Sequence, residues 1–228
     1  HPEHTGFAHL FEHLMFGGSA HIPDYDTPLQ LAGGENNAWT NNDITNYYLT
    51  VPKPNIETAF WLESDRMLEL AFSEQSLEVQ RGVVMEEFKQ RCLNQPYGDV
   101  GHLFRPLAFR VHPYRWPTIG KELSHIEQAT LDEVKSFFYR FYAPNNAVLA
   151  VTGNISWDET VKLTEKWFAP IPRRDVPVRQ LPQEPEQTQE RRLTVERNVP
   201  LDALFMGYHM CSREGADYYA FDILSDIL

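Results

Sequence analysis

The sequence has few cysteines, an excess of acidic over basic residues, and no long hydrophobic run. Two cysteines in 228 residues do not make a disulfide framework. No apolar run approaches the roughly 18 residues that span a bilayer, so no transmembrane helix is expected. The net charge of −12 argues against a nucleic-acid binder or a basic membrane-surface protein. A content of 42% apolar and 23% charged residues is instead typical of a globular protein with a sizeable core.

An initiator methionine and a signal peptide are also missing from the sequence. The chain begins at His1 and ends inside the apolar, helix-like run YYAFDILSDIL at 218–228. We therefore expect it to be a fragment of a longer protein. For that reason the sequence leaves the compartment, cytoplasm or periplasm, open.

Hydrophobic periodicity predicts several amphipathic helices. These helices are expected over residues 5–17, 54–72, 73–93, 130–142 and 157–171. Thr5, Ser73 and Thr130 are the candidate N-caps of three of them, because their hydroxyls can accept a first-turn N–H.

The content of β-branched and aromatic residues predicts strands elsewhere. Residues 37–51 are expected to form strands with a turn near Asn41 and Asn42, and 146–155 and 192–210 are also strand-like. Strands and helices in this mixed order favour the α+β class. Residues 95–123 are expected to be an irregular connection.

One stretch of the first predicted helix, AHLFEHLMF at 8–16, carries unexpected polar residues. On a helical wheel His9, Glu12 and His13 share one face. The opposite face is apolar and consists of Phe7, Leu10, Phe11 and Leu14. Two imidazoles at i, i+4 can bind one zinc ion, and the carboxylate between them can act on water. Such pairs also occur by chance on surface helices, so a third ligand is needed to support a metal site.

A candidate third ligand lies in LEVQRGVVMEEFKQ at 77–90. The apolar stripe of this predicted helix consists of Leu77, Val84 and Phe88. Glu86 falls opposite the stripe and should face solvent, whereas Glu87 falls beside it, on the same flank as Gln80. The wheel alone leaves open whether Glu87 is a ligand or an ordinary surface acid.

These segments together resemble the inverted-zincin, or insulinase/pitrilysin-type (M16), metallopeptidases, which include mitochondrial processing peptidases and bacterial zinc proteases. The resemblance rests on His-x-x-Glu-His at 9–13 and on QRGVVMEE at 80–87. It implies that the third ligand is Glu87, which lies 74 positions after His13. GGENNAWTNNDITNYY at 33–48 is similar to the family segment whose edge strand pairs with the peptide substrate. Asn37 and Ala38 are therefore implied in substrate binding.

The resemblance also implies a fold and a domain order. The fold would be the M16 (LuxS/MPP-like) half-domain, an antiparallel or mixed sheet with helices packed on one face. Residues 1–170 would form the N-terminal catalytic domain, 171–192 a proline-rich linker, and 193–228 the start of a C-terminal-type domain. A second M16-type half would be supplied by the same chain, a second copy or a partner subunit.

The implied activity is that of a zinc-dependent endopeptidase acting on peptides or small unfolded polypeptides. His9, His13 and Glu87 would bind one Zn²⁺ per chain, and Glu12 would be the general base. Gln80 stands where many members of the family carry a second glutamate, so it is a candidate for hydrogen bonding to a ligand.

Two alternatives belong to other classes of function. One is a non-catalytic scaffold or partner subunit of an M16-type assembly, although such subunits usually lose the ligands or the base. The other is a structural zinc module, which would need a fourth ligand. We expect the isolated 228 residues to bind zinc but to cleave peptides weakly or not at all.

Overall fold

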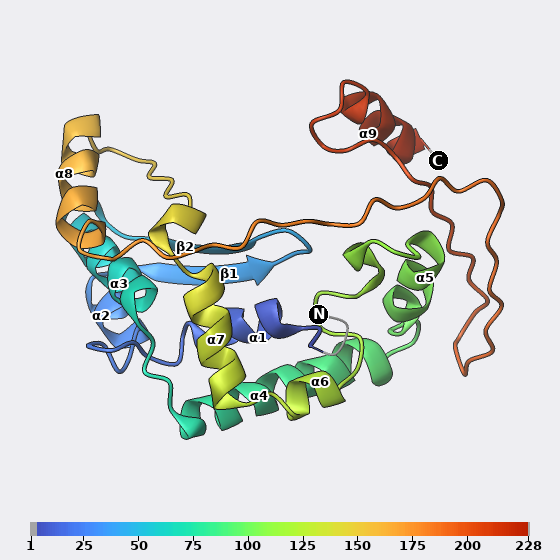
Figure 1. Ribbon diagram of the computed structural model, residues 1–228, viewed down its shortest axis with the longest axis horizontal. Coiled ribbons are helices and arrows are strands. Elements are labelled where there is room, and N and C mark those ends of the chain that lie inside the picture. The colour runs from blue at the N-terminus through green and yellow to red at the C-terminus, as the bar shows by residue number, and fades with distance from the viewer. Residues whose placement is uncertain (1–3, 228) are drawn as a thin grey trace.

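The computed structural model describes residues 4–227, and it consists mainly of helices arranged around one small sheet (Figure 1). The α-helices are α1 (Phe7–Leu14), α2 (Asp26–Leu31), α3 (Ile56–Leu68), α4 (Glu74–Phe88), α5 (Val100–Ala108), α6 (Ser124–Glu127), α7 (Leu131–Phe141), α8 (Trp157–Phe168) and α9 (Tyr218–Ile227). The strands are β1 (Glu35–Thr40) and β2 (Thr45–Thr50). Short helical turns lie at η1 (Lys53–Asn55), η2 (Lys89–Leu93), η3 (Pro113–Arg115) and η4 (Pro144–Asn146), of which η2 is a π-turn.

The sheet is an antiparallel hairpin. Its register runs from Glu35 opposite Thr50 to Thr40 opposite Thr45. The side chain of Asn41 closes the turn by accepting the backbone N–H groups of residues 43 and 44 at 2.8 and 2.9 Å. The predicted strand pair with its turn near Asn41 is confirmed, and so is the α+β class with an antiparallel sheet.

Helix α1 lies at the centre of the main core. Its predicted apolar face is buried, and that face consists of Phe7, Leu10, Phe11 and Leu14. Phe11 contacts Phe137 and Phe138 of α7, with ring centroids 5.0 and 6.1 Å apart. The same helix contacts α4, β1 and β2. The opposite face of α1, which carries the histidines, is therefore held at the junction of α4 and the hairpin.

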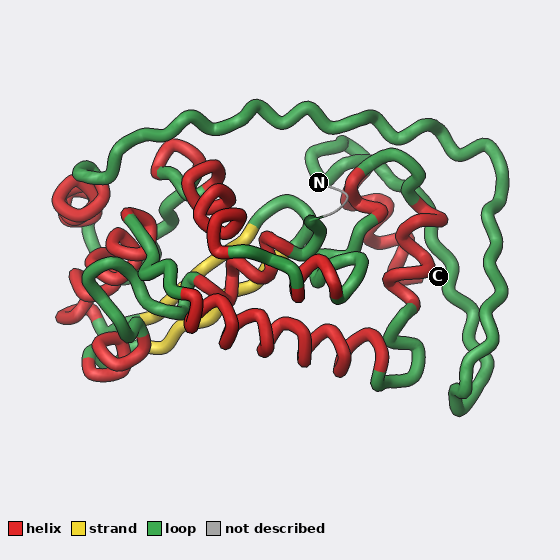
Figure 2. Tube along the Cα trace, turned by 60° about the horizontal axis from the view of Figure 1, so that its bottom comes forward, coloured by secondary structure: helices red, strands yellow, loops and turns green. Residues whose placement is uncertain are grey.

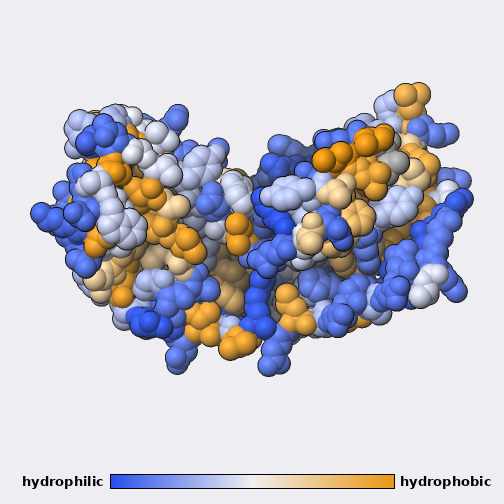
Figure 3. Space-filling view, turned by 90° about the horizontal axis from the view of Figure 1, so that it is seen from above, coloured by the Kyte–Doolittle hydropathy of each residue, from blue (hydrophilic) through white to orange (hydrophobic). Residues whose placement is uncertain are grey.

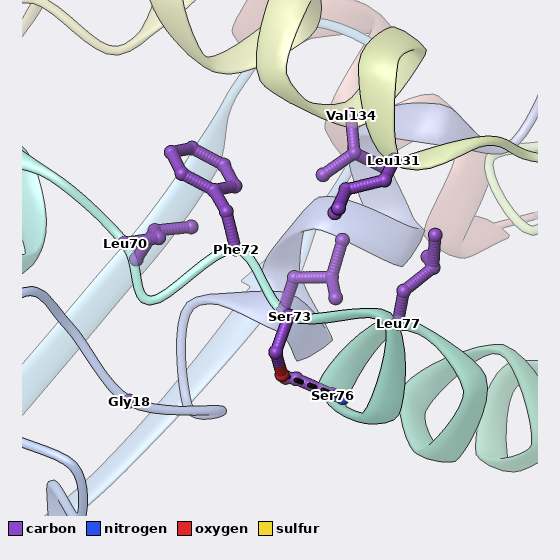
Figure 4. Close-up of a pocket in the computed structure, with 9 residues that line it drawn as sticks. Gly18, Leu70, Phe72, Ser73, Ser76, Leu77, Leu131 and Val134 are labelled. Carbon is purple, nitrogen blue, oxygen red and sulfur yellow. Dashed lines mark hydrogen bonds between the residues drawn. The ribbon is translucent and has the colours of Figure 1, made fainter.

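Helix α4 is fixed at its first turn and along its apolar stripe. Ser73 caps the helix, because its Oγ accepts the Ser76 N–H at 3.0 Å (Figure 4). The predicted stripe is buried, and it consists of Leu77, Val84 and Phe88. A cavity of only about 10 Å³ remains between this first turn and α7, so the joint is closely packed.

Of the other two predicted caps, one is confirmed and one is wrong. Thr130 and Glu133 form a capping box at the start of α7. Thr5 does not cap α1, because the N-cap is Gly6 with a φ of 87°. A Cβ at Gly6 would lie 2.8 Å from the Ile126 side chain, so glycine suits both the backbone angle and the space.

Two of the predicted strands are wrong. Residues 146–155 and 192–210 form no strand and pair with none within the described part of the chain, 4–227. Several of their apolar side chains lie in solvent, with Val148 96% and Leu204 81% exposed. A strand needs a neighbouring backbone to bond to, and local propensity cannot supply one. Conversely, the sequence does not predict α5 within 95–123, because Gly101 and Pro106 lower its helix propensity.

The segment from α8 to α9 is a long irregular path around the rest of the molecule (Figure 2). A few hydrogen bonds attach this segment to the rest of the molecule. Arg174 donates to the Leu68 carbonyl at 2.9 Å, and the Glu184 carboxylate accepts three consecutive backbone N–H groups at 110–112. Exposed apolar side chains gather on the side of the molecule that carries α9, and the surface is hollowed between two lobes (Figure 3). None of the helices between residues 4 and 227 is long and apolar enough to span a bilayer.

Candidate metal centre

Helices α1 and α4 bring two histidines and one glutamate together. The Nε2 atoms of His9 and His13 lie 3.5 and 3.4 Å from Oε2 of Glu87. One donor atom from each of the three side chains lies within 4.8 Å of the other two. The side chain of Glu86 is 56% exposed against 20% for Glu87, as the helical wheel predicts. Residues 74 positions apart in the sequence are thus neighbours in space.

Two of the three donor–donor distances suit ligands of a single tetrahedral zinc ion. Zinc–nitrogen and zinc–oxygen bonds of about 2.0–2.2 Å place neighbouring ligand atoms about 3.3–3.5 Å apart around a tetrahedron. The two measured distances to Glu87 Oε2, 3.4 and 3.5 Å, agree with that spacing. The two imidazole rings are nearly perpendicular, at 86°, with their centroids 4.9 Å apart. Three protein ligands are also the number found at catalytic zinc sites.

Burial affects the protonation of one donor, His9. Burial lowers the pKa of His9 and outweighs the opposing effect of the Glu87 carboxylate. The neutral imidazole, which has a free lone pair, is therefore favoured at neutral pH. Arg91, in the π-turn η2, pairs with Oε1 of Glu87 at 3.1 Å and leaves Oε2 facing the histidines. The Nδ1 atom of His9 is buried and has no hydrogen-bond partner among residues 4–227.

Glu12 lies on α1 between the two histidines but faces β1 instead of the donor cluster. Its Oε2 accepts a hydrogen bond from Thr40 Oγ1 at 2.5 Å. The Glu12 side chain is half-buried, so it is accessible to water. Glu12 therefore lies next to the donor cluster in the sequence but outside it in its contacts.

A buried aromatic layer supports the hairpin beside the site. The hydroxyls of Tyr47 on β2 and Tyr142 after α7 are 2.7 Å apart. Burial raises the pKa of Tyr142 to about 12, so this pair stays neutral at physiological pH. The Arg66 guanidinium lies 4.7 Å from the centroid of the Tyr47 ring and pairs with Glu63. The layer is therefore a structural support, and its hydroxyls do not ionise in the working range.

The remaining predicted residues lie on β1 and α4. Asn37 and Ala38 are in the middle of β1, opposite Tyr48 and Tyr47. β1 pairs only with β2 among the described residues, so its other edge is open, and there the Asn37 side chain accepts the Ala38 N–H at 2.8 Å. Gln80 is half-buried on α4, and its amide makes no hydrogen bond with any residue that the structure describes. Its predicted contact with a ligand stays a prediction.

Sequence reasoning missed two contacts of the site, those of Thr40 with Glu12 and of Arg91 with Glu87. Arg91 is four residues after Glu87 on a helical segment, a spacing that could have signalled the pair. The site does not lie in the larger cavity of the molecule. A cavity of about 270 Å³ lies between α3 and α8, and none of His9, His13 and Glu87 lines it.

Comparisons with known proteins show the family of the chain. Residues 1–104 match the family described as insulinase (peptidase family M16), and residues 128–228 match the peptidase M16 inactive domain. The zinc protease PqqE of Helicobacter pylori is 31% identical over 229 residues, which cover 98% of this chain and 51% of the relative. The uncharacterized zinc protease YmxG of Bacillus subtilis is 29% identical, over 73% of this chain and 41% of the relative.

Solved structures show the same fold. The crystal structure of a protease from Helicobacter pylori matches with a TM-score of 0.72 at 30% identity, over 80% of this chain and 45% of that one. The first half of the periplasmic protease PqqL from Escherichia coli matches with a TM-score of 0.70 at 23% identity, over 80% of this chain and 41% of that one. The chain spans about half the length of the Helicobacter pylori relative. The His-x-x-Glu-His helix, the converging glutamate and these matches together place the chain in the peptidase M16 (insulinase) family.

Proposed function

We propose that the full-length protein is a zinc-dependent endopeptidase that acts on peptides or small unfolded polypeptides. The observation that carries this proposal is the convergence of His9, His13 and Glu87, because both histidine–glutamate distances have the spacing of zinc ligands. The names of the relatives, zinc proteases from several bacteria, support the same reaction class. One zinc ion per chain would be held by the three side chains.

Each residue of the site has a role in this proposal. Zinc, when bound, supplies a Lewis acid that polarises the scissile carbonyl and activates water for attack. Glu12 takes the proton of the attacking water at a carboxylate oxygen and later donates it to the leaving amine. The buried, neutral His9 keeps its lone pair for the metal. Gln80 is proposed to hydrogen-bond a ligand once the site is loaded.

The open edge of β1 is the proposed peptide-binding strand. An extended peptide can pair with this edge through its backbone, which gives affinity for many sequences. Asn37 and Ala38 lie at the centre of that edge, and the Ala38 N–H already has an acceptor there in the Asn37 side chain. A substrate carbonyl would replace that acceptor. The strand ends at Thr40, beside Glu12, so a peptide on this edge passes the proposed general base.

The domain order and the partners are part of the same proposal. Residues 1–170 would form the catalytic domain, 171–192 the linker, and 193–228 the start of a C-terminal-type domain. Since the Helicobacter pylori relative is about twice as long as this chain, a second M16-type half is proposed to complete the peptide chamber. The alternative is a non-catalytic partner subunit, which is disfavoured because the proposed ligands His9, His13 and Glu87 and the proposed base Glu12 are all present in this chain.

Metal content tests the proposal. The full-length protein, supplied with zinc at neutral pH and dialysed, should carry one zinc per chain by native mass spectrometry. Glu87→Gln should bind zinc more weakly than wild type by more than the roughly 10- to 100-fold typical of outer-shell changes, because it removes a charged ligand. Glu86→Gln, one position away and exposed, is the matched control and should keep its zinc.

Two results would count against the proposal. A wild-type protein that takes up no zinc would move the function to a scaffold or an inactive partner subunit. Equal zinc content in the Glu87 and Glu86 variants would remove Glu87 from the ligand set.

A further inference from the structure

The hydroxyl of Thr40 links the hairpin to helix α1 through a hydrogen bond. Thr40 Oγ1 donates to Glu12 Oε2 at 2.5 Å, across 28 positions of sequence. We propose that Thr40 is a positioning residue, which holds the Glu12 carboxylate in the orientation needed for proton transfer. This inference rests on the proposed peptidase function and adds a residue to its machinery.

The direction of the hydrogen bonds follows from their chemistry. An ionised carboxylate can only accept, so the hydroxyl proton of Thr40 must point to Glu12. The hydroxyl of Thr45 lies 3.1 Å from the same Thr40 oxygen. Because the single proton of Thr40 goes to Glu12, a hydrogen bond between the two threonines has Thr45 as its donor; the Thr45 hydroxyl also hydrogen-bonds Tyr142. The result is a chain of contacts from β2 through β1 to Glu12.

This chain restrains a side chain that otherwise has three rotatable bonds. Thr40 is branched at Cβ and therefore stiff at χ1. Its backbone is fixed by pairing with Thr45 at the last register position of the hairpin. A donor anchored in this way holds Oε2 of Glu12 and leaves the other oxygen, Oε1, to receive the proton of water. Hydrogen bonds to a charged acceptor are also about twice as strong as neutral ones.

The position of Thr40 along β1 couples the base to the proposed peptide-binding edge. Thr40 lies two residues after Ala38, so the two side chains share one face of the strand. The strand whose edge would receive the peptide is thus the strand that holds the base. A shift of β1 on peptide binding would therefore also move the base. Because the Thr40 hydroxyl itself contacts Glu12, its loss should affect turnover more than peptide binding.

Three variants of the full-length, zinc-loaded protein test the inference with a quenched fluorescent peptide. Thr40→Val replaces the hydroxyl with a methyl group of similar size and should lower kcat by about 10- to 100-fold, the scale of a misplaced catalytic group. KM and zinc content should stay within about twofold, and Thr40→Ser should restore kcat to within about threefold. Thr50→Val is the matched control, because Thr50 is exposed on the same hairpin and should behave as wild type.

A second measurement is independent of turnover. In zinc-free protein labelled with carbon-13 at the glutamate carboxyls, the Glu12 resonance is identified by its absence from Glu12→Gln. It should shift in Thr40→Val but keep its position in Thr40→Ser and Thr50→Val. A purely structural role for Thr40 would change the melting temperature without moving this one resonance selectively.

The outcomes separate the two proposals. Wild-type turnover together with an unchanged kcat in Thr40→Val would overturn the role of Thr40 and leave the peptidase function standing, whether or not the resonance shifts. An equal fall of kcat in Thr40→Val and Thr50→Val would also overturn it, because general damage to the hairpin would then be the cause. Zinc-loaded wild type without any peptidase activity would overturn the proposed function and the role of Thr40 with it.

Discussion

Glu12→Gln is expected to lower the kcat of the full-length protein by about 10²- to 10⁴-fold, the range that general acid–base catalysis contributes. The amide has the shape of the carboxylate and can still accept the hydrogen bond of Thr40, but it cannot take a proton from water. Zinc content should remain at one per chain, because Glu12 lies outside the donor cluster. Steady-state kinetics and native mass spectrometry on the same samples measure both quantities.

Glu86→Gln is the control for this experiment, since it makes the same chemical change on an exposed helix face. Its kcat should match that of wild type. If Glu12→Gln retained wild-type turnover, Glu12 would not be the base, and another group would have to supply the proton transfer. If Glu12→Gln lost its zinc as well, the loss of activity would say nothing specific about proton transfer, and a role for Glu12 in holding the metal would replace our assignment.

Glu63→Ala is expected to lower the free energy of unfolding by about 3–5 kcal/mol, because it removes one partner of a buried ion pair. Arg66 is 2% exposed, and its Nε and Nη2 donate to the Glu63 carboxylate at 3.0 and 2.6 Å. Burial acts to lower the pKa of Arg66, but the Glu63 carboxylate, together with Tyr25 and Tyr47, more than offsets this and raises it, so the guanidinium stays charged. Its Nη1 has no partner among residues 4–227 even in the intact protein.

The loss of stability should extend to the hairpin, because the Arg66 guanidinium lies over the rings of Tyr25 and Tyr47, 4.5 and 4.7 Å from their centroids. Urea denaturation followed by fluorescence measures the change. Glu86→Ala is the matched control and should stay within about 0.5 kcal/mol of wild type, as exposed substitutions usually do. Equal, small changes in both variants would show that the charge of Arg66 is compensated by something other than Glu63.

Much of the candidate site could be predicted from local patterns. His9, Glu12 and His13 share a helix face because of their spacing alone, and that face is where the structure has them. The apolar stripe of α4 likewise separates Glu87 from Glu86 by burial. Such arguments succeed because the geometry within one helix depends only on its 3.6-residue period.

Contacts between elements could not be predicted in this way. The hydrogen bond from Thr40 to Glu12 joins β1 to α1, and no local pattern relates the two residues. The strands expected at 146–155 and 192–210 failed for the same reason, since a strand exists only where another backbone accepts its hydrogen bonds. Propensity describes what a segment can form, and its surroundings decide whether it does.

The sequence by itself therefore determined which residues are candidates for the site. The candidate ligand types, their faces on two helices and the family resemblance all follow from the order of amino acids, because they depend on local geometry and residue identity. Only the tertiary structure decided how that chemistry is assembled. It brought Glu87 within 3.5 Å of both histidines, turned its second oxygen to Arg91, and set Thr40 against Glu12. These contacts arise from the packing of α1 between α4 and the hairpin, and packing depends on the whole chain.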